Sequence, residues 1–339
     1  MRIVRTIAAL TLQLAGLAWA GDSVCATCHR QQAQHFAATP MALALSTATE
    51  SDILRQHPDL SFQEGAYRSR IVRSGEVSVL TVTDAGETLT VPLLWAFGRG
   101  QAGQTYVFEH NGNLYESRIS FYNALGALDL TMGAMGSRPQ SIEQAAGRKM
   151  DSVGARDCFG CHSTGGVSQG RLHVEGVSPG VGCESCHGPG EKHVAAMKTG
   201  DLAAAKMPRL SALGAEEMSE MCGQCHRTWS QIASTGPRGV NNVRFQPYRL
   251  ANSKCYDAAD RRIRCTACHD PHGSLETSLV KYDAKCAACH AAGTGRKICR
   301  TAKANCAGCH MPKLELPGAH AQFTDHQIRI VKAGEAYPN

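Results

Sequence analysis

Fourteen of the sixteen cysteines in this 339-residue chain occur as pairs with two residues between the members, and a histidine follows each pair. The cysteines are Cys25, Cys28, Cys158, Cys161, Cys183, Cys186, Cys222, Cys225, Cys265, Cys268, Cys286, Cys289, Cys306 and Cys309, and the histidines are His29, His162, His187, His226, His269, His290 and His310. Two thiols at this spacing can form thioethers with the vinyl groups of a haem, and the adjacent histidine can then ligate its iron. A zinc site or a redox dithiol does not need that histidine. The pattern therefore predicts seven c-type haems.

Eight further histidines compete for the seven axial positions that remain on the irons. A histidine there gives a low-spin iron suited to electron transfer, whereas an open position lets the iron bind a small molecule. Because the number of histidines nearly equals the number of axial positions, we expect mostly bis-histidine coordination. The alternative for each histidine is an ordinary surface or core position without a role in ligation. The stronger distal candidates are His173, His193, His272, His320 and His326, and the weaker ones are His35, His57, His110 and the thioether of Met41.

The position of some candidates indicates which haem they can reach. His193 and His272 follow their own motifs so closely that neither reaches the far face of its own haem easily. Each is therefore expected to ligate a neighbouring haem, which would join two haems into a packed pair. His320 and His326 follow the last motif and must serve haems attached earlier in the chain.

The N-terminus has the pattern of a secretory signal peptide. Two arginines precede an apolar run at residues 7–19, which ends in the small-x-small cleavage site Ala18-Trp19-Ala20. We expect a signal peptide over residues 1–20 and a mature protein that begins near Gly21, in the periplasm or another extracytoplasmic compartment. The alternative, an uncleaved membrane anchor, is disfavoured because the apolar run is short and interrupted. No later stretch is long and apolar enough to span a membrane.

Two cysteines, Cys255 and Cys299, lie outside the motifs. They form either a disulfide, which an oxidising compartment permits, or a pair of buried thiols. We favour the disulfide, since spare exposed thiols would be reactive outside the cytoplasm.

The motifs are unevenly spaced, because the first stands alone and the other six follow residue 157. The stretch between them is rich in β-branched and aromatic residues, which predicts strands over residues 67–72, 77–82, 89–97, 105–109 and 114–121. Asp84–Gly86 and Asn111-Gly112 supply turns, and the latter favours a hairpin. We interpret this stretch as a small antiparallel β subdomain, which serves as a packing platform for the first haem and its neighbours.

From residue 140 onward, short helical patterns alternate with glycine and proline. Residues 141–147 and 215–225 are predicted to be helical, and Gly176–Gly190 is predicted to be a loop. Aromatic residues make up only 6% of the chain, which fits a core filled partly by porphyrin. The expected fold is a multihaem cytochrome c of short helices and loops wrapped around seven haems, with the β subdomain between the first and second motifs. Its parts are the signal peptide 1–20, a first haem segment 21–61, the β-rich subdomain 62–137 and a six-haem domain 138–339.

The residues around the motifs carry a family resemblance. The stretches that carry it are Arg156–His162, Gly182–Gly190 with His193, Cys265–His272, Asn305–Lys313 and Phe323–Arg329. Together they resemble the periplasmic multihaem cytochromes of the cytochrome c554-like group, and more distantly hydroxylamine oxidoreductase and pentahaem nitrite reductase. The resemblance covers most of the mature chain and is strongest over residues 156–330.

The resemblance implies roles for individual residues. His193, His272, His320 and His326 match family histidines that are distal ligands or contact haem, and Cys255 and Cys299 stand where relatives tend to have cysteine. The chain also departs from the family. Met41 stands where many relatives have histidine, which leaves the ligand of an early haem open, and no C-x-x-C-K motif is present for a lysine-ligated haem. Many relatives continue into helical repeats after Phe323–Arg329, whereas this chain ends soon afterwards and is expected to stand alone.

Three functions fit these observations. The first is an electron carrier that passes electrons along the haems, and the second is an oxidoreductase in which one open haem acts on a small nitrogen or sulfur compound. The third is a subunit of a larger extracytoplasmic electron conduit. Binding of CO and a high-spin ferric EPR signal would separate the first two, and elution as a large oligomer would indicate the third.

Charge narrows the choice of partners. The sequence carries a net charge of +6, but loss of the signal peptide and ionisation of fourteen haem propionates would bring the holoprotein to roughly −3 when oxidised and −10 when reduced. Nucleic-acid binding is therefore not expected. The expected partners are other redox proteins, either cytochromes or quinol-linked membrane complexes, and the chain could form an oligomer.

Overall fold

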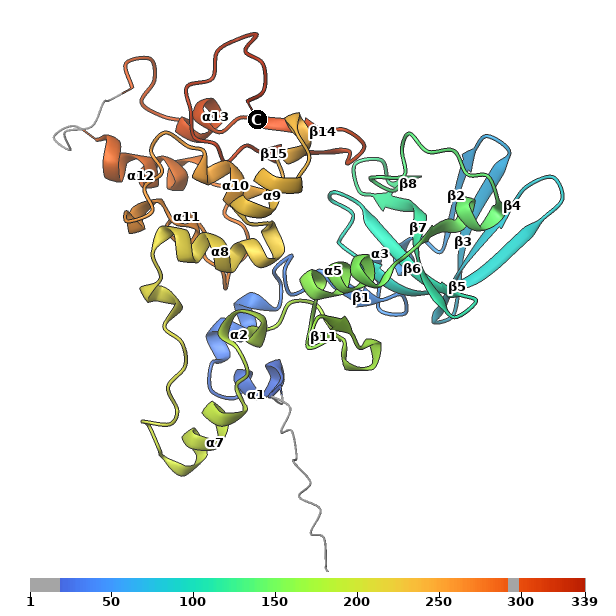
Figure 1. Ribbon diagram of the computed structural model, residues 1–339, viewed down its shortest axis with the longest axis horizontal. Coiled ribbons are helices and arrows are strands. Elements are labelled where there is room, and N and C mark those ends of the chain that lie inside the picture. The colour runs from blue at the N-terminus through green and yellow to red at the C-terminus, as the bar shows by residue number, and fades with distance from the viewer. Residues whose placement is uncertain (1–18, 292–298, 339) are drawn as a thin grey trace, which may run out of the picture.

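The computed structural model describes residues 19–291 and 299–338, in which a β-rich part lies beside a part built from short helices (Figure 1). The helices are α1 (Asp22–Ala26), α2 (Arg30–Phe36), α3 (Asp52–Gln56), α4 (Ile142–Ala146), α5 (Ser152–His162), α6 (Cys183–His187), α7 (Glu191–Thr199), α8 (Ala215–His226), α9 (Trp229–Thr235), α10 (Gln246–Ala251), α11 (Cys265–Cys268), α12 (Leu279–His290) and α13 (Cys306–His310). Within the described ranges, no helix is long and apolar enough to cross a membrane.

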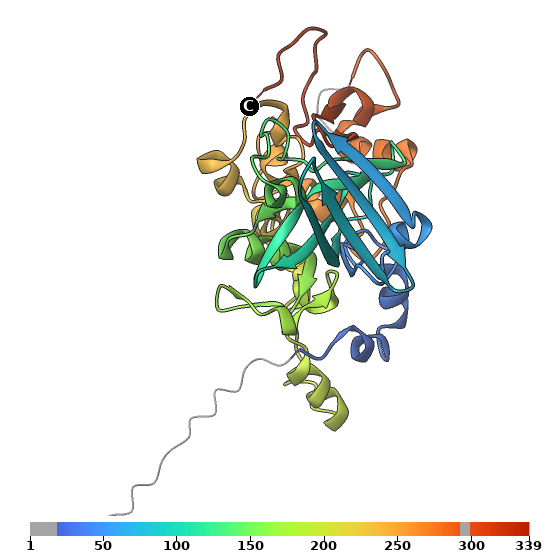
Figure 2. The same cartoon turned by 90° about the vertical axis from the view of Figure 1, so that its right-hand side faces the viewer.

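The β subdomain is a meander of antiparallel strands. Its main strands are β2 (Asp59–Glu64), β3 (Tyr67–Ser74), β4 (Val77–Thr83), β5 (Thr88–Phe97), β6 (Gln104–His110), β7 (Asn113–Tyr122) and β8 (Ala127–Leu130), each paired with the next. Two strands from flanking segments extend the sheet: β1 (Leu45–Thr47) pairs with β5, and β9 (Gly147–Lys149) pairs with β7. The sheet curls until β2 touches β8, and Arg118 of β7 forms an ion pair with Glu64 of β2 at 2.6 Å. Figure 2 looks onto this sheet, with the helical part behind it.

The largest side-chain core of the molecule lies inside the β subdomain. Alternating residues of the strands point inward, and Leu80, Tyr106 and Phe108 have no exposed surface. Helix α4 closes one side of this core with Ile142 and Ala145. The subdomain therefore has the ordinary anatomy of a small β protein.

The helical part is packed differently. Among its described helices, α11, α12 and α13 contain no buried residue, and the remaining cluster there comprises only Val243, Leu316 and Ala319 with a few partly buried neighbours. The small hairpin of β14 (Lys313–Leu316) and β15 (Ala321–Thr324) belongs to this cluster. Helices α8 and α10 do bury side chains, among them Met218 and Tyr248, so the lack of burial is not shared by every helix of this part.

Most of the predicted elements are confirmed. All five predicted strands are present, and the Asn111-Gly112 turn has positive φ at both residues, as a tight hairpin requires. The two predicted helices appear as α4 and α8. The loop prediction for Gly176–Gly190 is wrong in its centre, because the third motif itself forms the helical turn α6. The sheet is also larger than predicted, since β1, part of β2, and β9 lie outside residues 62–137.

Candidate haem sites

Every C-x-x-C-H motif is built on helical turns. Helices α5, α8 and α12 end on the histidines of the second, fourth and sixth motifs, and α6 and α13 consist of nothing but the third and seventh motifs. Residues three and four apart share one face of a helix, so in these five motifs both thiols and the histidine point the same way. In the first and fifth motifs the helix ends before the histidine. That is the arrangement a haem needs for two thioethers and one axial ligand.

Three motif histidines face a second histidine from elsewhere in the chain. His29 pairs with His193 at a ring-centroid distance of 6.4 Å, His187 with His272 at 6.0 Å, and His269 with His326 at 6.1 Å. The angles between the ring planes are 28°, 6° and 38°. Each pair joins segments that are far apart in the sequence.

These pairs test whether the residues fit a haem. Two rings in direct contact would lie about 3.5–4 Å apart, so the rings of these pairs do not pack directly on one another. A metal bound to an imidazole nitrogen on each side at about 2 Å also requires ring centroids about 6 Å apart. The three pairs fit an iron porphyrin ligated from both faces.

Hydrogen bonds orient several of these imidazoles. Backbone carbonyls accept from the Nδ1 atoms of His162 (Ala44, 3.0 Å), His193 (Ala205, 2.6 Å), His310 (Arg329, 2.8 Å) and His326 (Thr324, 3.0 Å). A carbonyl only accepts, so the proton sits on Nδ1 and Nε2 keeps its lone pair for a metal.

Burial keeps the rings neutral. It lowers the pKa of His162, His187, His226 and His269 below the ordinary value, and that of His326 to about 4. Neutral imidazole is the form that binds iron.

The motifs adjoin one another in a defined order. Cysteine side chains of different motifs lie close enough to shift one another's pKa in four places: Cys25 with Cys183, Cys161 with Cys225, Cys222 with Cys265, and Cys286 with Cys306. Contacts between α11 and α12 join the fifth and sixth motifs, and Cys186 of the third motif lies within electrostatic reach of Cys222 and Cys225. The order is first, third, fourth, fifth, sixth and seventh, with the second motif attached beside the fourth.

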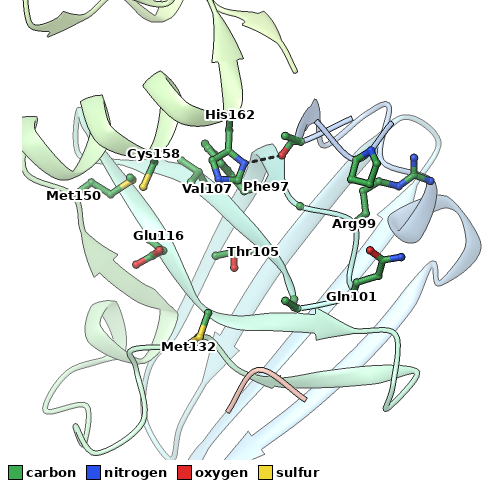
Figure 3. Close-up of a pocket in the computed structure, with 15 residues that line it drawn as sticks. Phe97, Arg99, Gln101, Thr105, Val107, Glu116, Met132, Met150, Cys158 and His162 are labelled. Carbon is green, nitrogen blue, oxygen red and sulfur yellow. Dashed lines mark hydrogen bonds between the residues drawn. The ribbon is translucent and has the colours of Figure 1, made fainter. Parts of the chain in front are cut away.

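The second motif borders a cavity of about 390 Å³ between α5 and the sheet (Figure 3). Cys158 and His162 line it from the helix, and Arg99, Gln101, Thr105, Val107, Glu116, Met132 and Met150 are among the residues that complete it. His162 is the only histidine in this lining, which separates this site from the three paired ones. The thioethers of Met132 and Met150 are the soft donors present.

The β subdomain forms most of the wall of this cavity. A glycine-rich loop at residues 98–103 closes one end, and Gly98 is required there because its φ is +83° and a Cβ would lie 2.7 Å from the Gly103 oxygen. Burial raises the pKa of the Cys158 thiol, and the negative charge of Glu116 raises it further, to about 11. The platform predicted for the first haem therefore serves the second motif, whereas the first motif packs on α6 through α1.

The structure places two strong distal candidates away from the paired rings. His320 lies on the hairpin after the last motif, where its Nε2 contacts Asp129 of β8 at 2.8 Å and its ring meets Tyr122 edge-on. His173 is exposed and faces Glu175 at 3.8 Å.

The weaker candidates are scattered. His35 is exposed on α2, His57 packs on Phe121 of the sheet, and His110 contacts Asn111 and Tyr115 at the end of β6. Met41 is half-buried, and its backbone oxygen accepts a hydrogen bond from Val181. Met132 and Met150 were missed because only their place in the fold, at the sheet and beside α5, brings them near a motif.

The remaining cysteines show no disulfide in the described part of the chain. Cys299 is exposed, and its Sγ accepts a hydrogen bond from the Ala302 amide at 3.5 Å. Cys255 lies within electrostatic reach of Cys286 in the sixth motif. The predicted signal peptide covers residues 1–20. Residues 1–18 lie outside the described residues, so the structure describes only its last two positions.

The segment that carries His326 is held by a buried ionic network. Asp325, next to His326, forms an ion pair with Arg249 at 2.9 Å, and both side chains are 0% exposed. Arg249 also donates to Gln327 and to the Pro338 carbonyl, and Arg329 donates to Asp325 at 2.5 Å. The buried Asp325 carboxylate is paired with two guanidinium groups, so this network fixes the segment that carries His326.

Comparison with known proteins relates two stretches of the chain to cytochrome families. Residues 131–188, with the second and third motifs, match the family described as cytochrome c554 and c-prime, and residues 258–295, with the fifth and sixth, match the doubled CXXCH motif. The multiheme cytochrome MtrA of Shewanella baltica is 25% identical over 206 residues, which cover 47% of this chain and 61% of that protein. Cytochrome c-554 of Nitrosomonas europaea is 33% identical over 109 residues, covering 27% of this chain and 46% of that protein.

The fold has a solved counterpart. The outer cell wall cytochrome OcwA superposes with a TM-score of 0.55 at 15% identity, covering 92% of this chain and 80% of that one. This likeness concerns the fold alone, and the chain spans less than two thirds of the two curated relatives above. The family matches extend over residues 131–188 and 258–295, and together with the C-x-x-C-H motifs they indicate a multihaem c-type cytochrome that is similar to cytochrome c554 over the first of these stretches.

Proposed function

We propose that this chain is a periplasmic heptahaem cytochrome that carries electrons between redox proteins along mostly bis-histidine haems. The observation that carries the proposal is the set of three imidazole pairs held 6.0–6.4 Å apart. When bound, a haem with two axial imidazoles takes up and releases one electron at its iron. The chain's own part is to keep His187, His269 and His326 neutral by burial, to orient His193 and His326 through Nδ1, and to tether each haem by two cysteines.

The order of the motifs supports a conducting series. Adjoining cysteines of two motifs hold the edges of their two haems together, so electrons could pass from the first motif through the third, fourth, fifth and sixth to the seventh. The second motif would be a branch, because its Cys161 meets only Cys225 of the fourth motif among the cysteine pairs of the described chain. A branch suits exchange with a small molecule better than passage between two proteins.

Removing distal ligands tests the carrier function. His272→Ala and His326→Ala should each turn one low-spin haem into a high-spin haem that binds CO, because each deletes one axial imidazole. His57→Ala is the matched control, since His57 packs on Phe121, and it should leave the EPR spectrum unchanged. If neither variant creates a high-spin haem, bis-histidine ligation by these residues is wrong.

The cavity beside His162 favours a second function. No histidine faces His162 across that lining, while Arg99, Gln101 and Glu116 offer polar groups to a small ligand. A haem tethered there with an open face would act as an oxidoreductase site for a small nitrogen or sulfur compound. The alternative is ligation by Met132 or Met150, which would close the site and leave a carrier.

CO titration of the native reduced protein separates these outcomes. One CO bound per chain supports the open site. No CO binding by the native protein, but one CO bound by Met132→Leu or Met150→Leu, indicates a thioether ligand and the pure carrier. Met197→Leu is the control, because Met197 is exposed and does not line the cavity.

The partners remain those expected of a redox carrier: cytochromes or quinol-linked membrane complexes. A subunit of a larger conduit would elute as a large assembly on a sizing column. If the partner is held by charge, its electron-transfer rate should fall as salt is raised.

A further inference from the structure

Glu184 is an unusual carboxylate, because it is 4% exposed and lies inside the third motif, between Cys183 and Cys186. Its oxygens accept three backbone hydrogen bonds: from Ala20 to Oε1 at 2.9 Å, from Gly21 to Oε2 at 2.9 Å, and from Gly190 to Oε1 at 2.6 Å. Two of its three donors therefore come from the residues that flank the expected cleavage site.

The surroundings of Glu184 lack a positive partner. None of the ion pairs in the described part of the chain includes it. A second carboxylate is close by, since Asp22 accepts a hydrogen bond from the Cys183 amide at 2.9 Å. A buried carboxylate without a cation is costly, and a second negative charge nearby adds to that cost.

We infer that Glu184 is the binding site for the α-ammonium group of the mature chain. Hydrolysis of the Ala20–Gly21 peptide bond adds one water, leaves a carboxylate on Ala20 and frees the amine of Gly21, which is protonated at neutral pH. The Gly21 nitrogen already lies 2.9 Å from Oε2, so the new charge appears beside the buried carboxylate. The backbone bond to Ala20 is lost, and Gly190 continues to donate to Oε1.

This ion pair would link export to the assembly of the first haem site. Gly21 precedes α1, which carries Cys25, and α1 packs on α6. His29, in the same segment, faces His193 of α7, which begins directly after Gly190. Fixing the new N-terminus on Glu184 therefore holds the two halves of that site together. The inference rests on the proposed export and on cleavage after Ala20.

The test is the acetylation rate of the N-terminal amine in the native holoprotein, measured by mass spectrometry after brief treatment with an N-hydroxysuccinimide ester. Intact mass should first show a chain that begins at Gly21. The amine should then react about tenfold more slowly than in the denatured protein, since a hydrogen bond to a charged group is worth about a factor of ten or more. Glu184→Gln should restore the fast rate, and Glu191→Gln, at an exposed neighbour, should not.

A second variant covers the case in which Glu184→Gln does not fold. A mature chain lengthened to begin at Trp19 keeps every backbone bond to Glu184 but moves the amine away, and its amine should react fast. An intact mass that shows another start overturns both the cleavage site and the ion pair. A start at Gly21 with a fast-reacting amine in the native protein overturns the ion pair alone and leaves export standing.

Discussion

The β subdomain and helices α11 to α13 differ in how much of their own side chains they bury. The strands bury their own side chains, such as Ile71, Leu80 and Ile119, which are at most 2% exposed. Helices α11 to α13 bury none, although they carry three of the seven motifs. The difference indicates that the first region is stable through its sequence, whereas the second needs its cofactors as core.

The largest effect should follow from withholding haem. In a chain produced without haem attachment, the helical part should unfold, because nothing replaces the porphyrin surface between its short helices. The β subdomain should remain folded on its own core. Limited proteolysis with mass spectrometry should recover a resistant fragment that contains residues 45–150, and equal protection of the whole chain would contradict the comparison.

The buried ion pair is the strongest side-chain contribution expected in the helical part. Asp325→Ala leaves the Arg249 guanidinium buried without its carboxylate and should lower the stability of the holoprotein by about 3–5 kcal/mol. The EPR signal of the haem that we propose His326 ligates should shift as well, since that segment is then loosened. Asp59→Asn, at the exposed ion pair with Arg70, is the control and should change neither chemical denaturation nor the spectrum.

A substitution in the core of the β subdomain should lower its stability without changing the haem spectra. Leu80→Ala removes a side chain with no exposed surface and should cost about 2–5 kcal/mol in urea unfolding of the subdomain. The haem spectra should keep their native positions, because this residue contacts no motif. A loss of low-spin signal in this variant would show that the two regions are not independent.

The smallest effect is expected at a helix cap. Ser141 caps α4 by accepting a hydrogen bond from Gln144, and Ser141→Ala should cost about 1 kcal/mol. Thermal unfolding followed at the sheet's circular dichroism signal should detect it. Ser141→Asn should restore the stability, as asparagine caps equally well.

The two regions also differ in how far the sequence predicts them. Strands such as β4 and the Asn111-Gly112 turn follow from alternation and turn chemistry, which are local. The haem-attachment residues can also be recognised locally, because each C-x-x-C-H motif is contained in five consecutive residues. The partners of the motif histidines are not local: His29 and His193 meet only through the packing of α1, α6 and α7.

Long-range packing also decides which motif the sheet supports. The sheet was expected to support the first haem and its neighbours. Instead α5 docks on the sheet through Phe159 and Ala155, and so carries the second motif to it. The sequence contains no local signal for this choice, and the cavity beside His162 is visible only once Glu116 and Met132 are brought together.

The number of haems tests the central claim most directly. Intact mass and iron content of the purified protein, followed by alkylation of free thiols, count the attached haems and the cysteines left over. The account predicts seven haems per chain, with no alkylation at any of the fourteen motif cysteines. A motif whose two cysteines remain free to alkylate would contradict it.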